Sequence, residues 1–102
     1  MDNDKLKYKE KLVEVAEILK AISHPTRLCI VTNLMFEDRN VNQMQNCLNV
    51  PQSTVSQHLS ILKSSGIIKG TRNGTEIVYS LVDERIKFII NYLILENNDS
   101  TL

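Results

Sequence analysis

Long apolar runs are missing from this sequence of 102 residues, so no segment is long enough to span a membrane. The start, Met-Asp-Asn-Asp-Lys, also lacks the cationic and apolar regions of a secretory signal. With 42% hydrophobic and 24% charged residues, the composition is that of a small globular domain with a modest core. We therefore expect one soluble domain over residues 1–102, located in the cytoplasm and without membrane contact.

Cysteine is scarce, and the two present, Cys29 and Cys47, do not have the spacing of a disulfide framework. A reducing compartment would keep both as thiols, and a buried cysteine is more often an inert hydrophobic residue than a reactive one. The alternative is that Cys29 and Cys47 form a redox-active pair. The sequence also lacks a glycine-rich phosphate loop, a Cys-x-x-Cys motif and paired carboxylates near a histidine. These absences predict a protein that is not an enzyme and needs no cofactor.

Acidic residues are absent from residues 39–75, which we call the acid-free stretch, although the whole chain has a formal net charge of zero. Four cations, Arg39, Lys63, Lys69 and Arg72, lie within it, and all twelve acids lie outside. Attraction to phosphate falls off over about 8–10 Å at physiological salt, so distant acids do little to cancel a local basic surface. The charge distribution therefore favours a polyanionic partner.

Residues 50–63 lie inside the acid-free stretch and predict a helix that starts near Pro51. Val55, Leu59 and Leu62 share one face at helical spacing. The other face carries short polar side chains and one cation: Gln52, Ser53, Ser56, Gln57, Ser60 and Lys63. The major groove of DNA accepts one helix, and Gln and Ser can contact base edges there. The pattern favours a DNA-reading helix, with an ordinary solvated face as the alternative.

The remaining elements follow from periodicity and turn residues. Helices are expected over about 5–22, 25–36 and 41–48 before the helix at 51, and a final helix over about 83–95. Strands over 67–72 and 76–81 flank Asn73-Gly74, a strong hairpin signal, and Gly66 suits a left-handed helix cap. The expected fold is mostly α with a β-hairpin wing, in the order α-α-α-α-β-β-α. This order predicts a winged helix-turn-helix with its DNA-binding core at about 25–81.

The wing would place more donors and cations beside the DNA-reading helix. A hairpin end can lie along the phosphate backbone while the helix occupies the major groove, although an ordinary solvated hairpin is the alternative. His58 flanks the apolar stripe, which favours a hydrogen bond that anchors the helix over a DNA contact. His24 precedes a proline at a helix junction, which favours a capping role. The candidate DNA-binding residues are Gln52, Ser53, Thr54, Ser56, Gln57, His58, Lys63, Lys69, Arg72 and Asn73.

The final predicted helix has almost no polar side. Such a helix must be covered on more than one face, and a second copy of the chain would provide the cover, together with the helix over 5–22. Burial under that helix within one chain is the alternative. Twofold symmetry would place two DNA-reading helices about 34 Å apart and predict a palindromic site on double-stranded DNA. The candidate homodimer-interface residues are Leu12, Leu19, Ile86, Ile89, Ile90 and Leu93.

Six short runs share a known pattern: 19–28 (LKAISHPTRL), 51–59 (PQSTVSQHL), 62–63 (LK), 66–68 (GII), 72–74 (RNG) and 78–81 (VYSL). They resemble the ArsR/SmtB family of small winged-helix repressors over about residues 12–95. The resemblance implies a homodimer that binds operator DNA and blocks transcription until an effector weakens binding. It also implies that Gln52, Ser53, Ser56, Gln57 and Arg72 face DNA.

The chain departs from the family at its sensing sites. Many relatives bind a soft metal through a Cys-x-Cys pair, but the matching positions here are Asn40 and Asn42. Other relatives use an Asp and several His on the final helix, where this chain has Asp83 but no His after His58. The departures predict that the protein binds no metal.

Persulfide-sensing relatives pair a Cys late in the second helix with another in the last helix. Here Thr32 occupies the first position, and the last helix has no Cys. We expect a DNA-binding regulator with a non-metal effector, and thiol redox chemistry is one option. A winged helix used only for protein–protein interaction is the alternative function.

Overall fold

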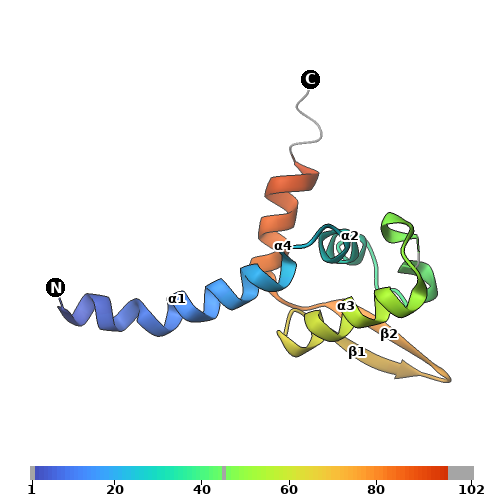
Figure 1. The fold of residues 1–102 in the computed structure, drawn as a ribbon, viewed down its shortest axis with the longest axis horizontal. Coiled ribbons are helices and arrows are strands. Elements are labelled where there is room, and N and C mark those ends of the chain that lie inside the picture. Colours follow the sequence, from blue (N-terminus) through green and yellow to red (C-terminus); the bar gives the residue numbers. More distant parts are fainter. Residues whose placement is uncertain (1, 45, 97–102) are drawn as a thin grey trace.

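The computed structural model describes residues 2–44 and 46–96 and has the predicted winged helix-turn-helix fold (Figure 1). Helices α2, α3 and the β-hairpin form one lobe, while α1 extends away from it and the final helix, which is α4 together with η3, rises beside the end of α1 (Figure 1). The elements in chain order are α1 (Asp2–Ile22), α2 (Pro25–Leu34), η1 (Asn42–Met44), η2 (Cys47–Asn49), α3 (Gln52–Ser64), β1 (Ile68–Asn73), β2 (Glu76–Leu81), α4 (Glu84–Ile90) and η3 (Asn91–Leu95).

Local sequence signals explain where α2 and α3 begin and end. His24 caps α2, because its Nδ1 accepts a hydrogen bond from the Thr26 N–H at 3.0 Å, and Pro25 occupies the first helical position. Pro51 is extended and precedes α3, which therefore starts one residue later than predicted. Gly66 follows α3 with φ +76°, the left-handed conformation expected of it.

The expected α-helix over 41–48 is instead two short 3₁₀ turns, η1 and η2. Asn40 and Gln43 form a reciprocal pair in which each backbone N–H donates to the other side chain, at 2.8 and 2.9 Å. Such side-chain bonds compete with a regular helix. Asn49 then takes φ 56°, which ends η2 and turns the chain toward α3.

The wing is an antiparallel pair whose register runs from Ile68 opposite Leu81 to Asn73 opposite Glu76. The two turn residues are Gly74 and Thr75, one position later than the predicted Asn73-Gly74. Gly74 has φ +69° whereas Thr75 has no positive φ, the pattern of a type II′ turn. Arg39 adds a short bridge to the other side of β2, because its backbone pairs with that of Tyr79 at 2.7 and 3.1 Å.

One hydrophobic cluster joins the helices and the wing. Buried side chains at its centre include Ile30, Val31, Val55, Leu59, Leu62, Ile67, Ile86 and Ile90. The prediction that Ile86 and Ile90 belong to a dimer interface is therefore wrong, because their exposed fractions within one chain are 0% and 1%. The final helix buries one face in its own chain, which is the alternative that the sequence left open for that face.

Candidate nucleic-acid interface

Helix α3 has one buried and one exposed face, as its sequence predicts. Val55, Leu59 and Leu62 are buried in the core and hold the helix against the lobe. Most of the candidate DNA-binding residues on α3 are exposed: Gln52, Ser53, Ser56, Gln57 and Lys63. Thr54 is half-buried. The exposed face contains no acid, so phosphates could approach it without like-charge repulsion.

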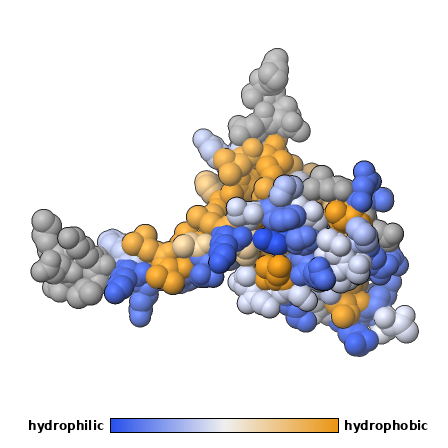
Figure 2. Space-filling view, in the orientation of Figure 1, coloured by the Kyte–Doolittle hydropathy of each residue, from blue (hydrophilic) through white to orange (hydrophobic). Residues whose placement is uncertain are grey.

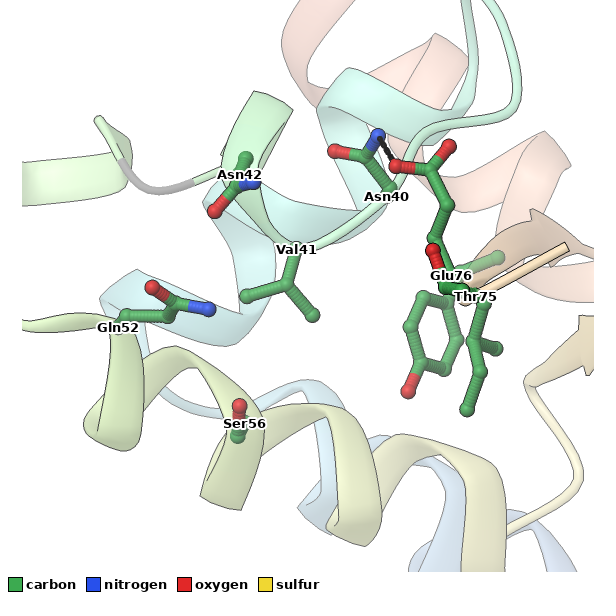
Figure 3. Close-up of a pocket in the computed structure, with 9 residues that line it drawn as sticks. Asn40, Val41, Asn42, Gln52, Ser56, Thr75 and Glu76 are labelled. Carbon is green, nitrogen blue, oxygen red and sulfur yellow. Dashed lines mark hydrogen bonds between the residues drawn. The ribbon is translucent and has the colours of Figure 1, made fainter. Parts of the chain in front are cut away.

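The start of α3 and the tip of the wing lie at the same end of the molecule (Figure 1). Between them is an open groove of about 370 Å³. Its lining residues are Asn40, Val41, Asn42, Gln52, Ser56, Thr75, Glu76, Ile77 and Tyr79. Gln52 and Ser56 project from successive turns of α3 toward this groove (Figure 3). The fold therefore brings two polar residues of the helix beside the turn of the wing.

The cations of the acid-free stretch have different surroundings. Arg39 lies 3.8 Å from the Glu37 carboxylate and is partly neutralised. Lys63, Lys69 and Arg72 are exposed, and within residues 2–44 and 46–96 no ion pair involves them. Asn73, the last residue of β1, is exposed as well. Three unpaired cations, one at the end of α3 and two on the wing, therefore remain available to a polyanion.

Glu76, for which the sequence predicted no role, is the one acid among the described residues that line the groove. Its Oε2 accepts a hydrogen bond from Asn40 Nδ2 at 3.1 Å, which joins the 39–42 segment to the base of the turn (Figure 3). This contact links residues 36 positions apart, so periodicity along the chain could not reveal it.

His58 connects α3 to the start of α2. Its Nδ1 lies 3.0 Å from Arg27 Nη1, its ring centroid is 4.5 Å from that of His24, and Arg27 Nε donates to the carbonyl of Ala21. Burial is the largest cause that lowers the pKa of His58, and the nearby His24 and Arg27 lower this pKa further. The neutral ring can accept from Arg27 through Nδ1. These contacts fit the anchoring role that the sequence favours for His58, and its DNA contact stays a prediction.

A second surface lies on the terminal helices. The exposed apolar side chains there, which we call the apolar flank, are Tyr8, Leu12, Val13, Leu19, Phe88, Tyr92 and Leu93. Figure 2 shows apolar residues gathered along α1 and the final helix, whereas the lobe is mainly hydrophilic on that side. Ile89 is half-buried between the two helices. Among the described residues, no helix has both the length and the apolar character to cross a bilayer.

Ion pairs fix the junction between the terminal helices. Arg85 Nη1 lies 2.9 Å from a Glu14 carboxylate oxygen, and Arg85 Nη2 lies 3.1 Å from Asp83. Burial raises the pKa of Asp83, but hydrogen bonds from the Arg85 side chain and from the N–H groups of Ile86 and Arg85 outweigh it, so the net shift is downward. Asp83 caps α4, because its side chain accepts hydrogen bonds from the backbone N–H groups of Arg85 and Ile86.

Cys29 of α2 and Cys47 of η2 are joined by a disulfide, with their Cα atoms 5.8 Å apart. The expectation of two thiols is therefore wrong for this structure. The sequence could not show the pairing, because 18 positions separate the residues and only the path of the chain through η1 and η2 brings Cys47 against α2.

Comparisons with known proteins agree with this geometry. The family described as bacterial regulatory protein, arsR family, matches residues 24–69. The HTH-type transcriptional repressor SmtB of Mycobacterium tuberculosis is 40% identical over 82 residues, which are 80% of this chain and 61% of the relative. The chain thus spans about three-fifths of that repressor's length.

Solved structures extend the similarity. The transcriptional repressor PagR of Bacillus anthracis superimposes with a TM-score of 0.74 at 41% identity, covering 82% of this chain and 97% of PagR. The homodimeric winged helix-turn-helix DNA-binding domain of Mb0332 from Mycobacterium bovis gives a TM-score of 0.75 at 27% identity, covering 87% of this chain and 83% of that domain.

Proposed function

We propose, because this chain belongs to the ArsR family of bacterial regulatory proteins, that it represses transcription by binding operator DNA as a homodimer. The observation that carries the proposal is the exposed, acid-free face of α3 beside a wing with unpaired cations. A DNA-binding role would also place the protein in the cytoplasm. The similar proteins SmtB and PagR are both transcriptional repressors, which supports repression as the direction of regulation.

The candidate residues divide into two roles. Gln and Ser side chains suit base edges in the major groove, so we assign base reading to Gln52, Ser53, Ser56 and Gln57. Cations and amides at the end of α3 and on the wing suit phosphate oxygens, so we assign backbone contacts to Lys63, Lys69, Arg72 and Asn73. The half-buried Thr54 would contribute from the side of the helix.

The apolar flank supports a homodimer. Leu12 and Phe88 are 67% and 71% exposed in the single chain, and Leu19 and Leu93 lie on the same two helices. Contiguous apolar surface of this kind marks an interaction site, and a twofold axis would cover α1 and the final helix of both copies at once. The dimer would present two α3 helices about 34 Å apart to a palindromic operator on double-stranded DNA.

A module for protein–protein interaction is the rival function, and binding to DNA of random sequence discriminates the two. Fluorescence anisotropy with a labelled 30-base-pair random duplex, read from about 50 to about 200 mM salt, should show binding that weakens steeply with salt, because phosphate contacts release counterions. Heparin retention should fall in parallel. No anisotropy change at the lowest salt would exclude the repressor function and favour the rival.

A further inference from the structure

The disulfide lies at the joint between the two helices of the helix-turn-helix. Cys29 is in the middle of α2, whereas Cys47 begins η2, the short turn that leads into α3. Gln52, the first residue of α3, follows Cys47 by only a few residues. The sulfur–sulfur bond therefore ties the approach to α3 directly to α2.

The side chain of Asn33 contacts both ends of this bond. Its Nδ2 donates to Cys47 Sγ at 3.1 Å and to the Cys29 carbonyl at 3.0 Å, and it lies 3.6 Å from Cys29 Sγ. An N–H group aimed at a sulfur stabilises the thiolate more than the neutral thiol. Asn33 thus favours Cys47 as the sulfur that leaves with the electron pair when the bond breaks.

The two cysteines differ in access. Cys47 is 3% exposed, whereas Cys29 is only partly buried at the edge of the core. An attacking thiolate can therefore approach the Cys29 sulfur more easily than the Cys47 sulfur. The accessibility of Cys29 and the Asn33 hydrogen bond to Cys47 therefore both favour attack at the Cys29 sulfur and departure of the Cys47 sulfur.

We propose that Cys29 and Cys47 form a thiol–disulfide exchange site for a dithiol reductant, and that its redox state controls operator affinity. A thiolate of the reductant attacks Cys29 Sγ, the protein disulfide breaks, and Cys47 departs as a thiolate. The second thiol of the reductant then attacks the mixed disulfide and releases Cys29. The reductant becomes a disulfide, its two protons pass to the cysteine sulfurs, and the protein gains two thiols.

The coupling to DNA follows from how weakly the start of α3 is held by local structure. Pro51 offers no side-chain cap to the first turn of α3, and Asn49 holds the left-handed conformation at φ 56°. Both features must be maintained by contacts from elsewhere in the fold. Reduction removes the covalent tie next to them. The reduced protein therefore holds Gln52 and Ser53 less firmly and reads its operator less well.

The test, which rests on the proposed function, compares oxidised and dithiothreitol-reduced wild-type protein on two duplexes: one selected from a random pool by the oxidised protein, and one of random sequence. Thiol titration verifies each state. Reduction should weaken binding to the selected duplex about tenfold, which is within the usual range of coupling between two sites. The affinity for the random duplex should not change. The double variant Cys29→Ser with Cys47→Ser should bind as the reduced protein does and ignore dithiothreitol.

Equal affinity of the two wild-type states for the selected duplex would overturn the coupling, as would an equal loss on both duplexes. Failure of both states to bind any duplex would instead refute the proposed function. Asn33 is tested by the rate of reduction with dithiothreitol, which Asn33→Ala should slow. Thr32→Ala is the matched control, because the Thr32 hydroxyl donates to the Leu28 carbonyl and, among the described residues, no hydrogen bond joins it to either sulfur. A rate for Asn33→Ala at or above that of the wild type would remove Asn33 from the exchange step.

Discussion

Replacing Arg72 with glutamine should change how strongly DNA binding depends on salt. Arg72 is exposed near the end of β1, opposite Ile77, and no ion pair within the described part of the chain engages its guanidinium. Glutamine keeps a long polar side chain but removes the charge. If Arg72 contacts a phosphate, the variant should bind more weakly at low salt and lose less affinity as salt rises.

The magnitude follows from counterion release and from the twofold symmetry of the proposed dimer. Each lost phosphate contact should reduce the slope of log affinity against log salt by about 0.9, so two symmetry-related contacts reduce it by about 1.8. Over a fourfold rise, from about 50 to about 200 mM salt, the wild type should therefore lose about 12-fold more affinity than the variant. A monomeric complex would give about half that change in slope.

Anisotropy titrations of wild type and Arg72→Gln on one random duplex, at five salt concentrations, measure both slopes. Lys9→Gln is the matched control, because Lys9 is an exposed cation on the part of α1 that extends away from the lobe (Figure 1). Its slope should equal that of the wild type. Equal slopes for wild type and Arg72→Gln, or equal reductions in both variants, would refute the assignment of the wing to the phosphate backbone.

The remaining predictions concern the helix, the dimer and the histidine contact. Ser56→Ala and Gln57→Ala should each cost about 1–3 kcal/mol on a selected operator but little on random duplex, and equal losses on both would contradict a base-reading role. Leu12→Glu should shift the protein from dimer to monomer in analytical ultracentrifugation, since it places a charge on the apolar flank; an unchanged mass would place the interface elsewhere. Because the pKa of His58 is lower when folded than its ordinary 6.5, the unfolded chain binds this proton first, and the free energy of unfolding should fall as pH drops below about 6.5. In urea melts from pH 7.5 to 5.5, the free energy of unfolding should fall less for His58→Gln than for the wild type. An identical fall in both proteins would assign the effect to another group.

Helix periodicity was sufficient to predict α3, because burial of one side is the physical cause of its pattern. Val55, Leu59 and Leu62 are buried, whereas Ser56, Gln57 and Ser60 between them are exposed. The caps at His24 and Gly66 were also predictable, since a histidine before proline and a glycine after a helix each satisfy backbone groups locally. The winged helix-turn-helix order follows from these local rules.

Other features depend on contacts that sequence spacing does not encode. The final helix looks apolar all round, but only the structure shows that Ile86 and Ile90 face the chain's own core while Phe88 remains exposed. The segment over 41–48 has helical spacing, yet the bonds between Asn40 and Gln43 favour tighter turns. Those turns bring Cys47 to Cys29, so the disulfide could not be predicted while a regular helix was expected over 41–48.

Selection of bound duplexes from a random pool, followed by sequencing, tests most directly whether two copies of α3 read DNA together. We predict enrichment of an inverted repeat whose half-site centres are about 10–10.5 base pairs, or a multiple of that spacing, apart. A pool that stays random after repeated rounds, or that converges on a single half-site without symmetry, would contradict the account.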